Sequence, residues 1–259
     1  MAHSNIYSKF MALFQKSYTQ PPFLMDNRIK GITITQFDYV IRNINDEELD
    51  IQGHPHHYSE FDHNGNLLKE IKYNRYGEFE EMFDYGYDQT GNLIRESYYP
   101  EENELAEEKI FSRNDSGLIV QALKNYQDGS IDTTTFLYDD SNQLIEKKTI
   151  TDEDEVEQIE KFEWENGILI NHEILDGDGE PLSEPEEHLA RPNQTRITHN
   201  ELNQVVSEEE LDDNGEVFMT VNRSYDEQGR ADEVEVFIDG RGKALSRHYF
   251  LKYDYTFFE

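Results

Sequence analysis

Four of the nine histidines fall within one short stretch, at His54, His56, His57 and His63. Imidazole is a common ligand of zinc and nickel, so such a cluster could hold a metal ion. On a regular strand, His54 and His56 would share one face, His57 would point to the other, and Pro55 would interrupt the hydrogen-bond ladder. A closed coordination sphere does not follow from this spacing. We therefore expect a polar loop, assign no metal or other cofactor, and keep a metal site as the alternative.

An acidic loop at 176–187 raises the question of calcium. Asp176, Asp178 and Glu180 occupy positions 1, 3 and 5 of an EF-hand count, and Glu187 falls at position 12. Position 6 of such a loop is glycine because the chain turns sharply there, whereas this chain has Pro181. No helical pattern flanks the loop. We expect an ordinary Asp-Gly turn, with calcium as the alternative.

Two acidic runs lie in a chain whose formal net charge is −33. Residues 1–45 carry five basic and two acidic side chains, so the rest of the chain carries a formal charge of −36. This density of carboxylates repels nucleic acid and anionic membranes and favours fast encounter with a basic protein. The alternative is a charge that serves solubility alone. Both acidic runs lie at or beside predicted turns, where we expect their side chains to reach solvent and a partner. The partner-binding candidates are Asp152, Glu153, Asp154 and Glu155 in the first run and Glu208, Glu209, Glu210, Asp212 and Asp213 in the second.

No constellation of residues predicts a reaction. The sequence holds 56 Asp and Glu, so carboxylate pairs spaced for glycoside hydrolysis arise by chance. It contains neither a G-x-S-x-G nucleophile elbow nor a Walker loop. There is no cysteine, which excludes a Cys nucleophile, Cys-ligated zinc and disulfides. We therefore assign no catalytic residues and expect a protein that is not an enzyme.

The elements that must position these residues are strands. From about residue 30 onward, apolar and polar residues alternate with period two; Tyr249, Leu251 and Tyr253, for example, alternate with Lys252 and Asp254. This alternation is typical of half-buried strands. A turn motif of an aromatic residue, Asp, two variable residues and Gly or Asn recurs about every 26 residues, with weaker turns between. The repeating unit is therefore one strand and one turn, in 12 to 14 residues.

The chemistry of the turn explains its composition. The Asp can accept hydrogen bonds from backbone N–H groups two residues further on, and Gly or Asn tolerates a positive φ. We expect Gly91 to need such a φ, so that Gly91→Val destabilises the fold more than the same change at Gly53, outside the repeat. The clearest turns are predicted near 62–66, 88–92, 139–142 and 226–229.

The segments "FDHNGNL", "YDQTGNL" and "YDEQGR" resemble the YD repeats of the RHS family, over about residues 55–255. The resemblance implies long β-sheets that spiral, and in bacterial polymorphic toxins such sheets form a cage around a toxic C-terminal domain. This chain departs from that pattern. It has too few repeats to close a cage, it lacks an Asp-Pro dipeptide, and its C-terminal "YFLKYDYTFFE" has a strand pattern. We carry over the strand–turn unit and expect no toxin domain.

Together these patterns predict an all-β fold, an antiparallel meander of about 14 strands in one coiled or half-shell sheet. Residues 1–22 are predicted to hold a single N-terminal α-helix that ends at two prolines. Residues 27–259 form the YD-like repeat domain, with a proline-rich loop insertion at about 176–196. The segment 1–18 lacks the apolar region of a signal peptide, and no apolar run reaches the roughly 20 residues of a membrane helix. We therefore expect a cytoplasmic protein.

The expected function is that of a non-enzymatic bacterial protein-binding module. The YD-repeat resemblance points to an immunity protein or an effector adaptor or chaperone of a toxin secretion system, and the charge points to a basic partner. One alternative is a nucleic-acid mimic that inhibits a DNA-binding protein. Another is a carbohydrate-binding protein or an enzyme on a β-repeat scaffold. The oligomeric state and the face that binds stay open.

Overall fold

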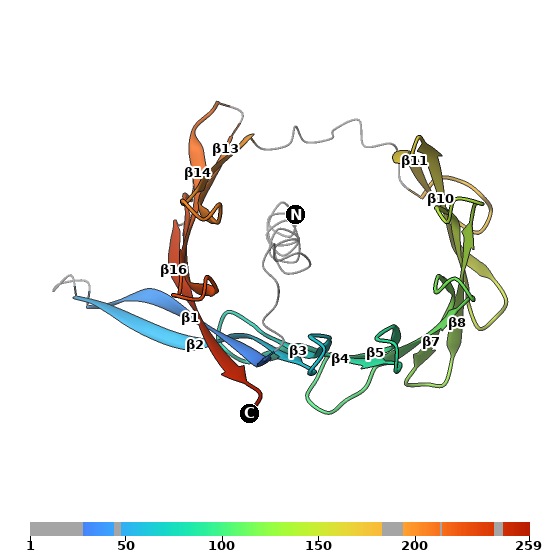
Figure 1. Cartoon of the computed structure of the whole chain (residues 1–259), viewed down its shortest axis with the longest axis horizontal. Coiled ribbons are helices and arrows are strands. Elements are labelled where there is room, and N and C mark those ends of the chain that lie inside the picture. Colours follow the sequence, from blue (N-terminus) through green and yellow to red (C-terminus); the bar gives the residue numbers. More distant parts are fainter. Residues whose placement is uncertain (1–27, 44–47, 183–193, 213, 241–245) are drawn as a thin grey trace.

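The computed structural model describes residues 28–43, 48–182, 194–212, 214–240 and 246–259. Within these ranges the chain is all-β, with no helix, and its sixteen strands form one antiparallel sheet. The expected all-β meander is confirmed, with sixteen strands in place of about fourteen. The sheet is open and bends into an arc (Figure 1). The expected N-terminal helix, in residues 1–22, lies outside the described residues.

The order of strands in the sheet places β1 next to both β2 and β16, near the middle. From there one arm runs from β2 to β11 and the other from β16 back to β12, so the two edge strands, β11 and β12, are consecutive in the chain. The predicted loop insertion connects these two edges, and its last three residues belong to β12. In chain order the strands are β1 (Ile29–Asn43), β2 (Glu48–Phe61), β3 (Leu67–Tyr73), β4 (Phe79–Tyr87), β5 (Leu93–Tyr99), β6 (Glu107–Arg113), β7 (Ile119–Tyr126), β8 (Ile131–Tyr138), β9 (Leu144–Ile150), β10 (Val156–Glu165), β11 (Ile168–Leu175), β12 (Gln194–His199), β13 (Val205–Leu211), β14 (Val217–Tyr225), β15 (Ala231–Ile238) and β16 (Arg247–Phe257).

The predicted turns share one set of hydrogen bonds, seen between β4 and β5. The Asp88 N–H donates to the carbonyl of Asn92 (2.9 Å), and the Gly91 N–H donates to the carbonyl of Asp88 (3.1 Å). Oδ1 of Asp88 accepts from the backbone N–H groups of Thr90 (2.8 Å) and Asn92 (2.9 Å). Gly91 has a φ of 84°. The same bonds form at 62–66, 139–143 and 226–230, which confirms the four predicted turns.

The aromatic residue before the turn has a role that the sequence pattern does not reveal. The hydroxyl of Tyr87 donates to the carbonyl of Leu67, the residue that follows the previous turn of this kind (2.9 Å). The bond connects one turn to the next turn on the same side of the sheet. It needs a Tyr or Trp because Phe has no donor. The bond recurs in Tyr138 to Ile119, Trp164 to Leu144, Tyr225 to Val205 and Tyr255 to Ala231.

The apolar core is concentrated on β1 and β14–β16. Leu251 and Val236 are fully buried, and Ile34 is 1% exposed. They belong to a cluster of ten buried side chains: Ile29, Ile32, Ile34, Phe61, Met219, Val221, Val234, Val236, Tyr249 and Leu251. On the described strands β3–β11 only Ala122 and Leu175 are buried hydrophobics. That arm must therefore depend more on its backbone ladder and cross-strand side-chain pairs.

The histidine-rich segment lies in strand β2, so the expectation of a polar loop is wrong. The register pairs His57 with Ile34 and His54 with Gln36, and a register shift leaves one extra residue, His56, between them. This β-bulge puts His54 and His57 on the same face, contrary to the alternation of a regular strand. The proline at 55 is accommodated at the irregularity, as is usual for proline within a sheet.

Candidate binding surfaces

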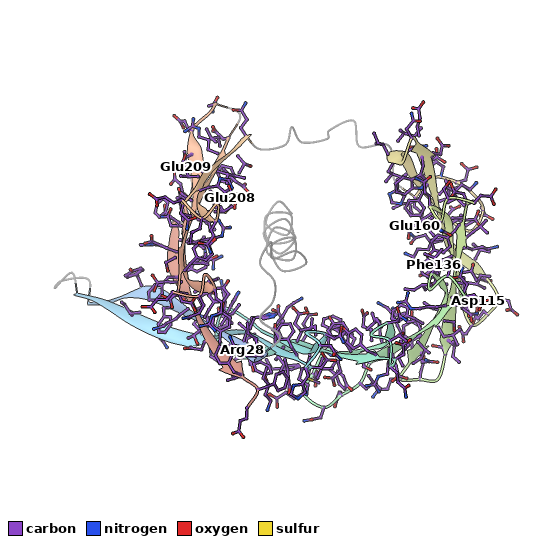
Figure 2. The ribbon with its side chains drawn as sticks, in the orientation of Figure 1. Arg28, Asp115, Phe136, Glu160, Glu208 and Glu209 are labelled. Carbon is purple, nitrogen blue, oxygen red and sulfur yellow. The ribbon has the colours of Figure 1, made fainter. Side chains whose placement is uncertain are left out.

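The sheet has an inner face toward the inside of the arc and an outer face. Figure 2 shows Glu160 and Glu208 on the inner side and Glu209 on the outer side. Opposite residues of neighbouring strands share a face, so the register assigns the other side chains to one face or the other. Cross-strand ion pairs of Lys and Arg occur on both faces, at 2.5–2.9 Å on the inner face and 3.5–3.9 Å on the outer face.

Charges on the inner face are joined in pairs across neighbouring strands. Each pair contributes on the order of 0.2–1 kcal/mol, as is usual for cross-strand ion pairs with partial exposure. Because of these pairs, the net charge over much of this face is close to zero. They are Lys72–Glu81 (2.6 Å), Lys109–Glu96 (2.8 Å), Lys124–Glu107 (2.9 Å), Lys147–Glu160 (2.5 Å) and Arg223–Glu208 (2.9 Å).

A shallow hollow of about 270 Å³ lies on the inner face over β4, β5 and β6, and we call it the inner hollow. The rings of Phe83 and Tyr98 are 5.0 Å apart between centroids and inclined by 35°. Sequence reasoning missed this site because its residues come from three strands and meet only through the register. The period-two pattern of Lys and Glu along these strands was the signal in the sequence that could have indicated the site. Its lining residues are Glu81, Phe83, Glu96, Tyr98, Glu107 and Lys109.

The first acidic run lies where the sequence placed it, in the turn between β9 and β10. Asp152, Glu153, Asp154 and Glu155 are all exposed. Asp154 takes the position that glycine holds in other turns, with a φ of 61°, and its N–H donates to the carbonyl of Thr151 (3.1 Å). Asp tolerates this conformation better than most residues. The run therefore presents four carboxylates to solvent on a turn with fixed geometry.

The second acidic run is divided by the sheet. Glu208 faces inward and pairs with Arg223, while Glu209 faces outward with Arg196 Nη1 at 3.5 Å. Glu210 is only 9% exposed, so the expectation that this whole run reaches solvent is wrong for that residue. Alternation along β13 is the reason, because successive side chains point to opposite faces. Asp213 lies outside the described residues.

Asp212 is the first residue of the turn that follows β13. Its Oδ1 accepts hydrogen bonds from the backbone N–H groups of Asn214 (3.0 Å) and Glu216 (2.8 Å). Asp212 therefore fixes its own turn, in the same way as Asp88 fixes the turn after β4.

Both runs reach the same side of the sheet, at the ends of the strands where the turns meet solvent. Strands alternate in direction, so every connection that leaves an odd-numbered strand lies on one rim and every connection that leaves an even-numbered strand lies on the other. We call the first the acidic rim and the second the opposite rim. Among the described residues, the connections of the acidic rim are 74–78, 100–106, 127–130, 151–155, 176–182, 212, 214–216, 239–240 and 246.

The two rims differ in charge. The described connections of the acidic rim carry fifteen carboxylates and one basic side chain, Arg75, whereas those of the opposite rim carry eight carboxylates and Arg230. All but Asp176 and Asp212 of the fifteen are exposed. The fifteen are Glu78, Glu101, Glu102, Glu104, Asp128, Asp152, Glu153, Asp154, Glu155, Asp176, Asp178, Glu180, Asp212, Glu216 and Asp239. The eight are Asp62, Asp88, Asp115, Asp139, Asp140, Glu201, Asp226 and Glu227.

Turn geometry keeps some of these carboxylates ionised. Hydrogen bonds from the side chain and the backbone N–H of Ser130 lower the pKa of Asp128 on the acidic rim. On the opposite rim, hydrogen bonds from Thr90 and Asn92 lower the pKa of Asp88. A hydrogen bond to the charged form favours that form. The charge at these turns therefore persists below the ordinary titration range of aspartate.

The histidines have partners within the sheet. His54 Nε2 lies 2.8 Å from Asp38 Oδ2, and His57 Nε2 lies 3.2 Å from Glu70 Oε1. His63 lies apart from them and stacks on Phe258, with ring centroids 3.8 Å apart. Burial lowers the pKa of His56 to about 4, with further lowering by the neighbouring His57 and His54. No group of three His, Asp or Glu side chains in the described ranges is placed to hold a metal ion.

The segment that resembles a calcium loop begins as a repeat turn. Oδ1 of Asp176 accepts from the N–H groups of Asp178 (3.0 Å) and Glu180 (2.9 Å), and Gly179 has a φ of 85°. This is the Asp-Gly turn expected from the repeat spacing. Glu187 lies outside the described residues. The described part of the chain holds no helix long and apolar enough to cross a membrane.

Comparisons with known proteins do not assign the chain to a family. No family model matches it, and no curated protein matches it in sequence. Among solved structures it is similar to a porin-like protein from Bacteroides uniformis, at 10% identity and a TM-score of 0.39, over 88% of this chain and 98% of that one. A structure described as TcdB2-TccC3-TEV matches at 12% identity and a TM-score of 0.17, over 82% of this chain and 14% of that one. Similarities this weak carry no argument about function.

Proposed function

We propose that this protein is a non-enzymatic binding module that captures a basic protein through its acidic rim. The observation that supports the proposal is the charge of the described rim connections, fifteen carboxylates against one basic side chain. Carboxylates in the middle of the inner face already have lysine partners, whereas the run at 152–155 is exposed at a turn. Exposed loops on a rigid scaffold are common sites of recognition.

The biological role that we propose is an immunity protein or an effector adaptor of a bacterial toxin system. The resemblance of the turns to YD repeats supports this role, because that family includes the shells of polymorphic toxins. A toxin that acts on nucleic acid has a basic surface, which an acidic rim would complement. Charge complementarity of this kind gives a high association rate and discrimination between partners.

The first experiment is co-purification of the full chain from its native cells, followed by identification of the bound protein. A toxin or a component of a secretion system supports the proposal. A DNA-binding protein of the host would instead favour a nucleic-acid mimic, and recovery of no basic protein at all would contradict the proposal.

A matched pair of variants then tests whether binding depends on the acidic rim or only on the net charge of the protein. The rim variant carries Asp152→Asn, Glu153→Gln, Asp154→Asn and Glu155→Gln, which keeps side-chain size and leaves Asn at the left-handed position. Its control neutralises four exposed carboxylates of the opposite rim: Asp115, Asp140, Glu201 and Glu227. Both variants lose four charges. The proposal expects the co-purified partner to bind the rim variant more weakly than the control, and equal binding by the two would contradict it.

A further inference from the structure

We propose that the inner hollow is a binding site for a neutral sugar ring. The site lies on the inner face, next to the 100–106 connection of the acidic rim, but it does not depend on the function proposed for that rim. Its floor is formed by Phe83 of β4 and Tyr98 of β5, which lie opposite each other in the register. Both side chains are partly exposed. The two rings, inclined by 35° to each other, give an apolar aromatic surface that suits the C–H face of a pyranose.

The border of the hollow supplies both donors and acceptors. Its three glutamates are each paired with a lysine, as Lys72–Glu81, Lys109–Glu96 and Lys124–Glu107, and of these lysines Lys109 also lines the hollow. An ammonium group has three donors and a carboxylate has about four acceptor positions, so each pair retains hydrogen-bonding capacity after its mutual contact. A sugar hydroxyl both donates and accepts. It can therefore bond to either member of a pair without separating the two.

The same pairing argues against a charged ligand. An anion would compete with the glutamates for the lysines, and a cation would compete with the lysines for the glutamates. Either would have to displace a partner from an existing ion pair, at the modest cost typical of each partly exposed pair. A neutral polyol avoids that cost. The chemical class that fits is therefore an uncharged saccharide, in preference to a phosphorylated or acidic one.

Tyr98 adds a hydroxyl at the floor of the hollow. This hydroxyl has no hydrogen-bond partner among the described residues. Burial raises the pKa of Tyr98, and the carboxylates of Glu81 and Glu107 raise it further. The phenol is therefore protonated at neutral pH and can donate to a sugar oxygen. Lys72 Nζ lies 5.6 Å from the centroid of the Phe83 ring, a cation–π contact between the aromatic floor and its polar border.

The test is titration of the full chain with cellohexaose, maltohexaose and xylohexaose, followed by NMR or calorimetry, with oligogalacturonate as a charged comparison. We expect saturable binding of at least one neutral oligosaccharide and weaker binding of the acidic one. Tyr98→Leu should weaken binding about tenfold or more, because it removes both the flat ring and the hydroxyl. Tyr98→Phe should weaken it about threefold to tenfold, the value of one hydrogen bond.

Tyr99 supplies the matched control. It is the next residue on β5, so its side chain points to the outer face, and Tyr99→Leu should leave sugar affinity unchanged. The rim variant described above should also retain sugar binding. Absence of saturable binding by every neutral oligosaccharide would overturn the inference, as would tighter binding of oligogalacturonate. Equal losses from Tyr98→Leu and Tyr99→Leu would overturn it too, because that result would locate the binding away from the inner hollow.

Discussion

Substitution of two glycines tests the physical account of the repeat. Gly91 has a φ of 84°, and a Cβ added there would meet no atom within 4 Å. The cost of Gly91→Val is therefore a backbone cost, about 1–2 kcal/mol for a residue with a side chain in the left-handed region. Asn occupies the equivalent position in the turn after β8, where Asn142 has a φ of 62°. Gly91→Asn should consequently cost only a few tenths of a kcal/mol, since Asn tolerates that region.

Gly53 is restricted for a different reason. Its φ is not in the left-handed region, but a Cβ there would lie 2.6 Å from Cε1 of Phe37, and the Phe37 ring stacks on Phe250 with centroids 4.8 Å apart. Overpacking of this kind costs about 1–3 kcal/mol. Gly53→Ala should therefore destabilise at least as much as Gly91→Ala. The structure thus reverses the sequence-based expectation that Gly53 is the more tolerant position.

The assay is urea unfolding followed by circular dichroism, with the free energy of unfolding compared between the wild type and the four variants. We expect Gly91→Asn near the wild type, with Gly91→Val and Gly53→Ala clearly below it. Equal stability of Gly91→Asn and Gly91→Val would refute the positive-φ argument. A neutral Gly53→Ala would refute the close approach to Phe37.

Three further outcomes are expected. The pKa of His56 is about 4 in the folded chain and 6.5 when unperturbed, so the unfolded chain binds a proton in that window that the folded chain does not. Stability should fall by about 3 kcal/mol as pH drops from about 6.5 to 4, and His56→Gln should flatten urea-measured stability across that range. Tyr225→Phe, which removes the donor to the Val205 carbonyl, should cost about 1 kcal/mol in urea unfolding, while Tyr76→Phe at a 66% exposed site should cost almost nothing. The pKa of Asp88 is lower in the folded chain than its unperturbed value of 3.8, so ionised Asp88 contributes stability above pH 3.8 that is lost as pH falls through the folded pKa. Asp88→Asn should therefore reduce the loss of stability below pH 4 in acid titration.

The turns could be predicted from the sequence because their causes are local. Asp88 and Gly91 act within five residues, and the same spacing marks the other turns. The bulge at His56 could not be predicted, because it depends on how β2 pairs with β1, which is not encoded in the histidines themselves. The alternation of side chains along the strands was visible in the sequence. The burial of Glu210 could not be predicted from it, because that burial depends on the position of β13 in the sheet.

The positions of strands in the sheet also lay beyond the sequence pattern. The sequence does not show that β9, which carries Lys147 and Lys148, is an interior strand or that the edges are β11 and β12. The inner hollow depends on residues of β4, β5 and β6 that meet only through their register. The acidic rim follows from the alternating direction of sixteen strands, so it could be recognised only once their order in the sheet was known.

The association rate of the co-purified partner, measured across ionic strength, tests the central proposal most directly. The Debye length shrinks from about 10 Å at 0.1 M salt to about 3 Å at 1 M, so attraction by the rim should weaken steeply over that range. We predict a fast rate for the wild type that falls with salt. The rim variant at 152–155 should associate more slowly and depend less on salt, and the opposite-rim control should stay close to the wild type. A wild-type rate that does not change with salt, together with identical rates for the two variants, would contradict recognition through the acidic rim.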